Sequence, residues 1–350
     1  MGLTERLLSA AATRPHVLLV PVPGRSDLRW AVEDWLDAQG WPQAASPAGA
    51  DLLIECGTPA VELAERADAA WDALPGPRDR ARVRQPDEVD AVLSAARSRL
   101  LDGPRQRQDA QERGVPVVAE PSGDMDPGGM DMGGMDDGGM DMGGMDMGGM
   151  DMGGMDMDLP GGLTMAGRVE DRDGLRLEGL PVRFGPLLPD WPAGLELQTT
   201  LSGDVLIDSR CRWLDPSDGP VPDRAVVPGP AAALDALSRL LAVAGWQDGA
   251  RRARRARAEA GSGPATDDLL RRLRRTRLLR WSLRGLPAPE GRDLTEHLNL
   301  LIACVDSSSS RLPVATLHEL DQAVTGLDVA GAVLVVAAYG PVLFRERVDA

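Results

Sequence analysis

The feature that most constrains this chain is a low-complexity tract of glycine, methionine and aspartate near its middle. The pentad GGMDM runs six times from Gly128 to Met157, with Asp137 in place of one methionine. Glycine loses the most entropy on ordering, and ten aspartates between residues 124 and 158 keep this segment solvated and self-repelling. Such a tract cannot supply a core, so it divides the chain into two parts that must each fold around their own.

The N-terminal part alternates between strand and helix patterns. The short apolar runs His16–Pro23 and Asp51–Cys56 predict buried strands, and residues 81–85 (ARVRQ) predict a third. A stretch with helical spacing of apolar residues follows each strand. The order β-α-β-α-β-α predicts an α/β domain over residues 1–103, with a small parallel sheet that forms a flavodoxin-like piece.

The C-terminal part, residues 169–350, predicts an α-rich α+β domain. Strict alternation of apolar and polar residues predicts a strand over 194–207, inside a strand region that covers 174–207. The sequence from 228 to 350 has the pattern of helices. Between the two domains, residues 104–168 predict a disordered linker of low complexity.

Charge, cysteine spacing and apolar stretches limit the kind of protein that this chain can be. The net charge is −16, and all 38 basic residues are arginine, which is typical of a GC-rich genome such as an actinobacterial one. Cys56, Cys211 and Cys304 lie too far apart to indicate a disulfide framework or a zinc or iron–sulfur site. No signal peptide is indicated, and the longest apolar stretch is shorter than a membrane span. We expect a cytoplasmic protein without a cofactor, with a peripheral position at the inner face of the membrane as the alternative.

Residues 50–83 carry a resemblance in the N-terminal part. Trp71, Leu74, Pro75, Pro77 and Arg78 follow a strand and a helix in the pattern aromatic-x-x-Leu-Pro-x-Pro-Arg. This segment resembles the small iron–sulfur subunit of respiratory complex I, the NADH–quinone oxidoreductase, which is related to the small subunit of [NiFe]-hydrogenases.

Two segments of the C-terminal part resemble the large subunit of the same enzymes. Residues 185–206 (GPLLPDWPAGLELQTTLSGDVL) are similar to the start of the quinone-facing subunit of complex I, a relative of the hydrogenase large subunit. Residues 327–350 are similar to its terminal helix and tail. The resemblance therefore implies a fusion of two neighbouring subunits, whose folded parts pack together.

This sequence lacks the residues that bind the metal clusters and the quinone in that family. The family's small subunit holds a [4Fe–4S] cluster through four cysteines, whereas this segment has Cys56 alone, which predicts a buried residue at a strand end. Leu188 stands where the family has the histidine that contacts the quinone headgroup. The nickel–iron cysteine motifs are absent from the sequence. His297 and His318 are isolated and predict ordinary histidines with satisfied hydrogen bonds.

The methionine tract offers a different chemistry. Thioether sulfur is a soft ligand that suits Cu(I), and the spacing M-x-M-x-x-M resembles copper-handling methionine motifs. A flexible linker and an oxidant scavenger are the other interpretations of the tract. The candidate copper ligands are Met130, Met132, Met135, Met140, Met142, Met145, Met147, Met150, Met152, Met155 and Met157.

Two arginine-rich helical stretches follow. Such stretches bind acidic protein surfaces, anionic headgroups or nucleic acid, although nucleic acid is disfavoured here because aromatic residues are scarce. The alternative is a solvated helix face. The predicted partner surface consists of Arg251, Arg252, Arg254, Arg255, Arg271, Arg272, Arg274 and Arg275.

Together these observations predict a catalytically degenerate fusion. We expect a non-catalytic accessory, assembly or structural component of a complex-I-like or hydrogenase-like respiratory module, with subunits of that module as partners. The alternatives are a Met-rich Cu(I)-buffering protein and an Arg-rich binder of membrane surfaces or nucleic acid.

Overall fold

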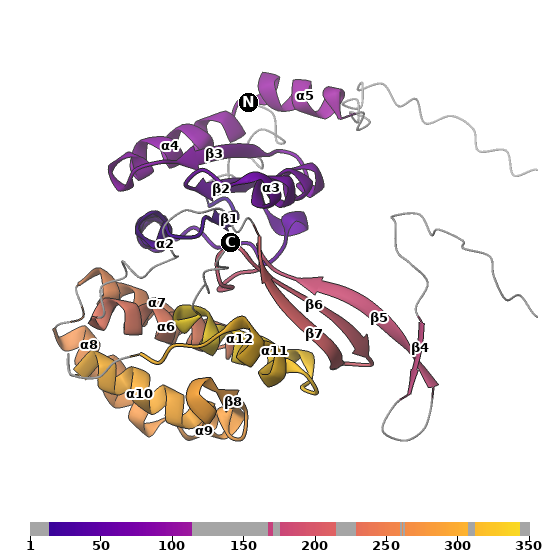
Figure 1. The fold of residues 1–350 in the computed structure, drawn as a ribbon. Helices are drawn as coiled ribbons and strands as arrows, with labels where there is room; N and C mark the ends of the chain where they lie inside the picture. Colours follow the sequence, from indigo (N-terminus) through magenta and orange to yellow (C-terminus); the bar gives the residue numbers. More distant parts are fainter. Residues whose placement is uncertain are drawn as a thin grey trace, which may run out of the picture.

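The structure is a computed structural model that describes two folded parts packed against each other (Figure 1). The methionine tract and its eleven candidate copper ligands lie outside the described residues. For residues 167–170 and 176–178 the backbone alone is described. The described residues are 14–113, 167–170, 176–214, 229–259, 261, 263–306 and 312–343.

A three-stranded parallel sheet forms the centre of the N-terminal part, as predicted. Its strands are β1 (Val17–Pro21), β2 (Leu52–Cys56) and β3 (Asp79–Val83), in the spatial order β1-β2-β3. Val17 pairs with Leu52, and Leu52 pairs with Asp79. Every residue of β2 is buried, which explains its run Leu52–Ile54, and the one charged residue, Glu55, is paired with Arg80 and Arg82 of β3.

The strand order corrects the expectation of a flavodoxin-like piece. In that fold the first strand lies between the second and the third, whereas here β2 is central. After α2 (Ser26–Gln39) the chain returns along the outer edge of β1, where Gln43 makes a single parallel bridge to Val17. The chain then crosses to the other edge of β1 to form β2. The single bridge at Gln43 therefore lies where a flavodoxin-like sheet would have a full strand.

Helices cover both faces of this sheet. Leu28, Val32 and Leu36 of α2 and Leu93 of α4 (Val89–Leu100) share one core with Ile54. On the opposite face, α3 (Val61–Ala73) packs Leu63 and Ala67 against Leu18, Val20 and Leu53. Successive side chains along the strands therefore point into two different apolar layers, as a sheet buried on both sides requires.

Residues 103–112 correct the predicted start of the linker at 104. They form α5 (Gly103–Glu112), whose first turn is capped by the Asp102 side chain accepting from the Arg105 N–H. The Gln106 side chain donates to the carbonyls of Arg78 and Arg99 and accepts from the Arg78 N–H. These contacts dock a polar helix that has no buried residue, which is why its apolar pattern gave no signal.

The C-terminal part begins with an antiparallel sheet in the order β4-β5-β6-β7. The predicted single strand over 194–207 is wrong, because Gly203 and Asp204 form a two-residue turn between β6 and β7. Gly203 has φ +61°, the conformation that such hairpin turns favour. The strands are β4 (Gly167–Glu170), β5 (Arg176–Phe184), β6 (Leu195–Ser202) and β7 (Val205–Trp213).

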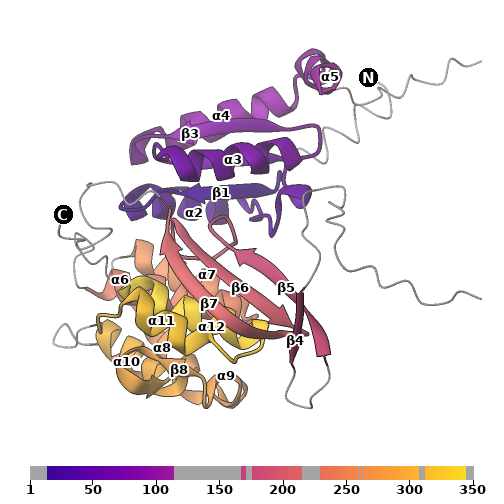
Figure 2. The ribbon, with the colours of Figure 1, turned by 45° about the vertical axis from the view of Figure 1, so that its right-hand side comes forward.

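Seven helices pack beside this sheet within the described residues (Figure 2). All residues of α6 from Ala232 to Ala242 are buried, including the charged Asp235 and Arg239, so this helix is enclosed nearly all round. A short β8–β9 hairpin (Pro287–Ala288 and Arg292–Asp293) interrupts the region predicted as helices alone. The helices are α6 (Pro230–Val243), α7 (Gln247–Ala258), α8 (Pro264–Arg275), α9 (Arg277–Leu283), α10 (Leu294–Asp306), α11 (Leu317–Val324) and α12 (Val329–Tyr339).

The apolar stretch at 329–344 contributes to this core. Its helix α12 buries Ala332, Val335 and Val336, and the loop before it pairs with β7 through the Leu206 N–H and the Leu327 carbonyl at 2.9 Å. Among the described helices, none has both the length and the apolar character that a membrane span needs.

Candidate functional site

The most elaborate polar arrangement of the described residues lies where the two halves meet. The N-terminal half contributes α2 and α3, and the C-terminal half contributes the loop at 185–194, β6, β7, α6 and α7 (Figure 1). Leu214, which follows β7, is part of the apolar core under α3. At the same junction, Gly194 lies against Pro23 so closely that a Cβ would stand 2.6 Å from the Pro23 ring. The halves thus share both apolar and polar contacts.

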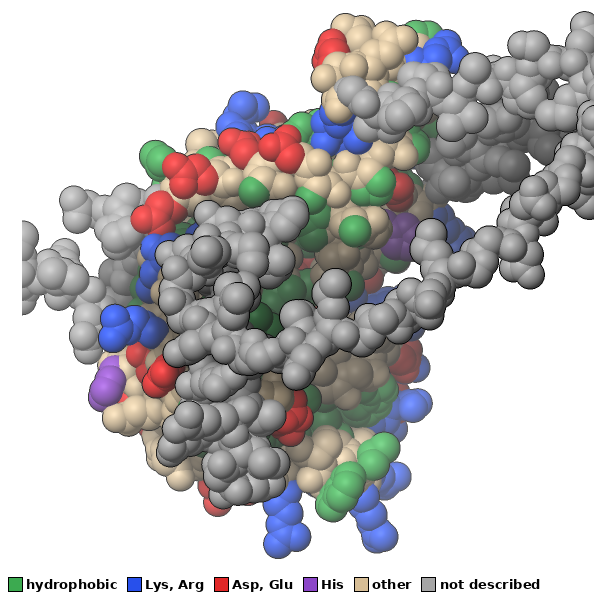
Figure 3. Space-filling view, turned by 90° about the vertical axis from the view of Figure 1, so that its right-hand side faces the viewer, with side chains coloured by type: hydrophobic (Ala, Val, Ile, Leu, Met, Phe, Trp, Pro, Cys, Tyr) green, Lys and Arg blue, Asp and Glu red, His purple; other side chains and the backbone are tan. Residues whose placement is uncertain are grey.

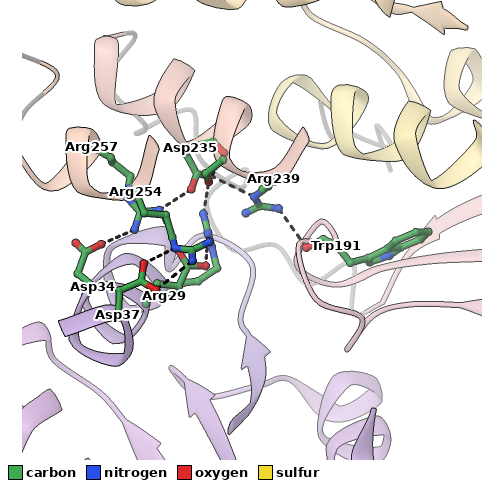
Figure 4. A network of polar contacts seen from close by, with 10 residues as sticks. Arg29, Asp34, Asp37, Trp191, Asp235, Arg239, Arg254 and Arg257 are labelled. Carbon is green, nitrogen blue, oxygen red and sulfur yellow. Dashed lines mark hydrogen bonds and ion pairs between the residues drawn. The ribbon is translucent and has the colours of Figure 1, made fainter. Parts of the chain in front are cut away.

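A set of buried ion pairs joins α2 to α6 and α7, and we call it the interface cluster (Figure 4). Arg29 donates to Glu33 and to Asp235, both at 2.6 Å. Arg257 donates to Glu33 at 2.9 Å and to Asp235 at 2.7 Å. The interface cluster comprises Arg29, Glu33, Asp34, Asp37, Asp190, Asp235, Arg239, Arg254 and Arg257.

The outer members extend the cluster along both helices. Arg254 holds Asp37 through two hydrogen bonds of 2.7 and 3.1 Å, the planar fork geometry that suits a carboxylate. Arg257 also donates to Asp34 at 2.8 Å. Arg239 lies 3.3 Å from Asp235 and donates to the Trp191 carbonyl at 3.1 Å. The cluster therefore ties α2 to α6 and α7, and ties α6 to the loop at 185–194.

The charges of the interface cluster are buried, so their pairing affects both pKa values and stability. The Arg257 side chain is 1% exposed, and its guanidinium lies 5.0 Å from the centre of the Trp30 ring. Burial opposes ionisation of Glu33, yet Arg29 and Arg257 outweigh it and hold the pKa of Glu33 below its ordinary value. Asp235 behaves in the same way, with its pKa lowered chiefly by Arg29, Arg239 and Arg257 against the effect of burial. Removing one partner would leave a buried charge uncompensated, which is costly.

Asp190 is the unbalanced member of the cluster. Its carboxylate has no hydrogen bond or ion pair among the described residues, and its backbone has φ +59°. The cluster contains five acids and four arginines, so one acid lacks a matching positive charge. Burial, followed by the charge of Glu33, raises the pKa of Asp190 to about 6.

A cavity of about 20 Å³ lies next to Asp190, between β1 and the loop at 185–194. Leu18 and Leu19 line one side, and Leu187, Leu188 and Pro189 line the other. Its volume suits a single water molecule. Leu188, the residue that the resemblance places at the quinone-contacting position, therefore lies at the junction of the two halves.

A second ionic bridge connects the halves beside α3. Glu196 of β6 is 1% exposed and accepts from Arg66 of α3 at 2.9 Å and from Arg212 of β7 at 3.0 Å. Arg212 in turn donates to Glu62 of α3 at 2.7 Å. These contacts fix the sheet of the C-terminal half against α3, on the opposite side of the N-terminal sheet from α2.

The predicted partner surface is corrected by these contacts. Arg254 is buried inside the molecule, and four other members are paired within it. Arg271 and Arg272 contact Asp268 of their own helix, and Arg252 of α7 contacts the same carboxylate because α7 and α8 lie side by side. Arg274 pairs with Asp306 of α10. Of the eight predicted arginines, Arg251, Arg255 and Arg275 are exposed without a partner in the described chain.

The sequence contains a signal for this burial. Ala250, Ala253 and Arg257 recur at helical spacing on α7, so the small residues mark a stripe that packs and carries its arginines inward. The acids of α2 at 33, 34 and 37 had no basic partner on their own helix except Arg29. Excess acid on one buried helix and excess arginine on another indicates an ionic contact between them.

All three cysteines are buried in the structure. Cys56 is buried at the end of β2, as expected, and burial raises the pKa of its thiol to about 12. Cys211 and Cys304 are also buried and free.

His297 corrects the expectation of satisfied hydrogen bonds, because it is fully buried and neither ring nitrogen has a partner in the described residues. No cluster of three or more His, Cys, Asp or Glu that could hold a metal occurs in the described part of the chain.

An open groove of about 700 Å³ lies over β5, β6 and β7. Arg183, Gln198 and Arg210 stand side by side across its three strands, because they are partners in the strand register. The groove is polar along this row and apolar at Leu180 and Val182. It was not anticipated from the sequence, since it exists only when the three strands pair.

Comparison with protein-family models, with curated proteins and with solved structures found no match for this chain. The resemblance to complex I and hydrogenase subunits therefore rests on the residues quoted above.

Proposed function

We propose that this chain is a non-catalytic accessory, assembly or structural component of a complex-I-like or hydrogenase-like respiratory module. Its partners would be protein subunits of that module. The N-terminal half would stand in for a small subunit and the C-terminal half for part of a large subunit, joined in one chain.

One observation carries this proposal. Leu188 stands where the resemblance implies a quinone-contacting histidine, and it lies at the junction of the two halves beside a cavity of about 20 Å³. That volume accommodates a water molecule and is far below the 300–1,000 Å³ typical of small-molecule sites. Next to this cavity, the ion pairs Arg29–Asp235 and Arg257–Glu33 hold the two halves together. A junction of this kind suits a docking unit better than an enzyme.

The proposal is tested in the native host by tagging the chain at its chromosomal locus. Membranes are solubilised in mild detergent, and native electrophoresis is followed by mass spectrometry of the bands. We expect the tagged chain to migrate with subunits of an NADH–quinone oxidoreductase or hydrogenase. Migration at its own size while that module stays intact would overturn the proposal.

Two variants separate this function from copper buffering. Deleting residues 124–158 removes the methionine tract and leaves both folded halves, so co-migration should persist. Arg254→Met with Arg257→Met disrupts the interface cluster, so co-migration should be lost. If the tract deletion leaves co-migration unchanged yet makes growth copper-sensitive, the tract has a separate copper role.

A further inference from the structure

The outward face of α9 exposes two large apolar side chains. Leu278 and Trp281 are each 74% exposed, whereas Leu279 and Leu283 on the opposite face of the helix are buried. Leu278 and Trp281 are three residues apart, so they are neighbours on one face. The other large apolar residues exposed in the described chain lie singly on separate elements: Val61, Leu101, Leu180, Leu188 and Val314. The pair on α9 is therefore distinct from ordinary scattered exposure.

Arginines surround this pair. Residues 271–284 contain seven arginines and no acidic residue. Four of the seven contact described residues, namely Asp268, Asp306 or Asn299. The remaining three, Arg275, Arg277 and Arg284, are exposed and have no partner in the described chain. We call these three arginines together with Leu278 and Trp281 the α9 patch.

The α9 patch lies at one end of the molecule. Figure 1 shows α9 at the end farthest from the N-terminal sheet and its helices α4 and α5. At that lower end, arginine and hydrophobic side chains project together from the surface (Figure 3). The patch therefore projects outward, and a flat surface can reach it without touching the junction between the halves.

We propose that the α9 patch docks this protein on the surface of an anionic lipid bilayer. Trp281 and Leu278 would enter the headgroup region, where tryptophan is favoured because its ring is amphipathic. Arg275, Arg277 and Arg284 would remain at the level of the lipid phosphates, with their aliphatic stems along the apolar pair. An apolar pair inside a group of unpaired arginines on a projecting helix matches the layered chemistry of a bilayer surface.

The exposed apolar pair favours a lipid surface over a nucleic acid. A nucleic acid backbone would satisfy the arginines but gain little from an exposed leucine. The chain as a whole carries a net charge of −16, so it is repelled from an anionic surface at long range. Any attraction must arise locally at the α9 patch. The proposal holds whether or not the protein has a respiratory partner.

The test uses the full chain and sedimented vesicles. One set contains phosphatidylcholine alone, and the other contains equal parts of phosphatidylcholine and phosphatidylglycerol. We expect binding to the anionic vesicles, weaker binding as salt is raised, and little binding to the neutral ones. Absence of binding to the anionic vesicles at low salt would overturn the proposal.

Charge-matched variants locate the binding surface. Arg277→Gln with Arg284→Gln should weaken binding on the order of 10- to 30-fold, since each basic residue near such a surface adds roughly a factor of five. The matched control, Arg251→Gln with Arg255→Gln, changes two exposed, unpaired arginines of α7 and should bind like the parent chain. Equal losses in both variants would overturn the assignment to α9.

A second pair of variants tests the apolar residues. Leu278→Ser with Trp281→Ser retains every arginine, and we expect its binding to fall about tenfold or more. In vesicles with brominated acyl chains, the parent chain should show quenched tryptophan fluorescence, and Trp281→Phe should bind but lose that quenching. Unchanged quenching in Trp281→Phe would place a different tryptophan in the bilayer, and full binding by the serine variant would show that the apolar pair does not enter it. Either result would overturn the proposal. Thermal melts confirm that each variant is folded.

Discussion

At the scale of single residues, Asp190 sets a pH dependence that is opposite to that of most carboxylates. Its pKa rises from 3.8 to about 6 on folding, because it is half-buried at the junction and lies near the charge of Glu33. The folded state therefore holds the proton more tightly, and stability is lost as the pH rises from about 4 to 6. Asp190→Asn should remove this loss and gain about 3 kcal/mol above pH 7, with little gain below pH 4. Urea denaturation across this range measures it, and an equal effect at both ends would contradict the assignment.

His297 acts in the reverse direction. Burial lowers its pKa from 6.5 to about 4, so the folded state binds the proton less tightly than the unfolded state. Stability is present above pH 6.5 and declines as the pH falls toward 4, by about 3 kcal/mol in total. His297→Leu should remove that decline while retaining the apolar packing. The measurement is the same denaturation series, in which a variant that still loses stability as steeply as the parent would show that another group titrates.

At the scale of elements, α7 holds α2 through its arginines. Arg254→Met should destabilise the protein by about 3 kcal/mol, because it leaves Asp37 poorly solvated and unpaired. Its neighbour on the same helix, Arg255, is exposed, so Arg255→Met should change stability by less than about 0.5 kcal/mol. Denaturant unfolding of both variants gives the comparison. Adding Asp37→Asn to Arg254→Met should cost less than the sum of the single changes, and strict additivity would mean that the pair does not interact.

Several elements were predicted from sequence patterns, and two were missed, for physical reasons. The strands and helices of the N-terminal half were predicted because their apolar periodicity directly reflects burial on a sheet or helix face. The polar α5 was missed because its docking depends on Gln106 and its cap at Asp102. The β6–β7 turn was missed because alternation continues across Gly203, and only the left-handed backbone there reverses the chain.

At the scale of the whole molecule, the halves form one unit through contacts that do not involve the methionine tract. A protease site placed between residues 120 and 160 should therefore yield two fragments that co-elute in size-exclusion chromatography at micromolar concentration. The combination of Arg254→Met and Arg257→Met should separate them, because it removes most of the polar ties between α2 and α7. Two independent peaks from the cut parent chain would show that the interface holds only while the tether is intact.

The sequence by itself determined the two-part organisation and the elements of each half, since apolar periodicity and a glycine-rich tract are local properties. It also placed Cys56 at a buried strand end. Tertiary structure alone decided the central position of β2 and the burial of Arg254 and Arg257. It also decided the exposure of Leu278 and Trp281. The physical reason is that the charges on one helix do not specify which group they will pair with. The same arginines serve a solvated face or a buried ion pair, and the choice depends on whether acids from a distant helix such as α2 are brought within hydrogen-bonding distance.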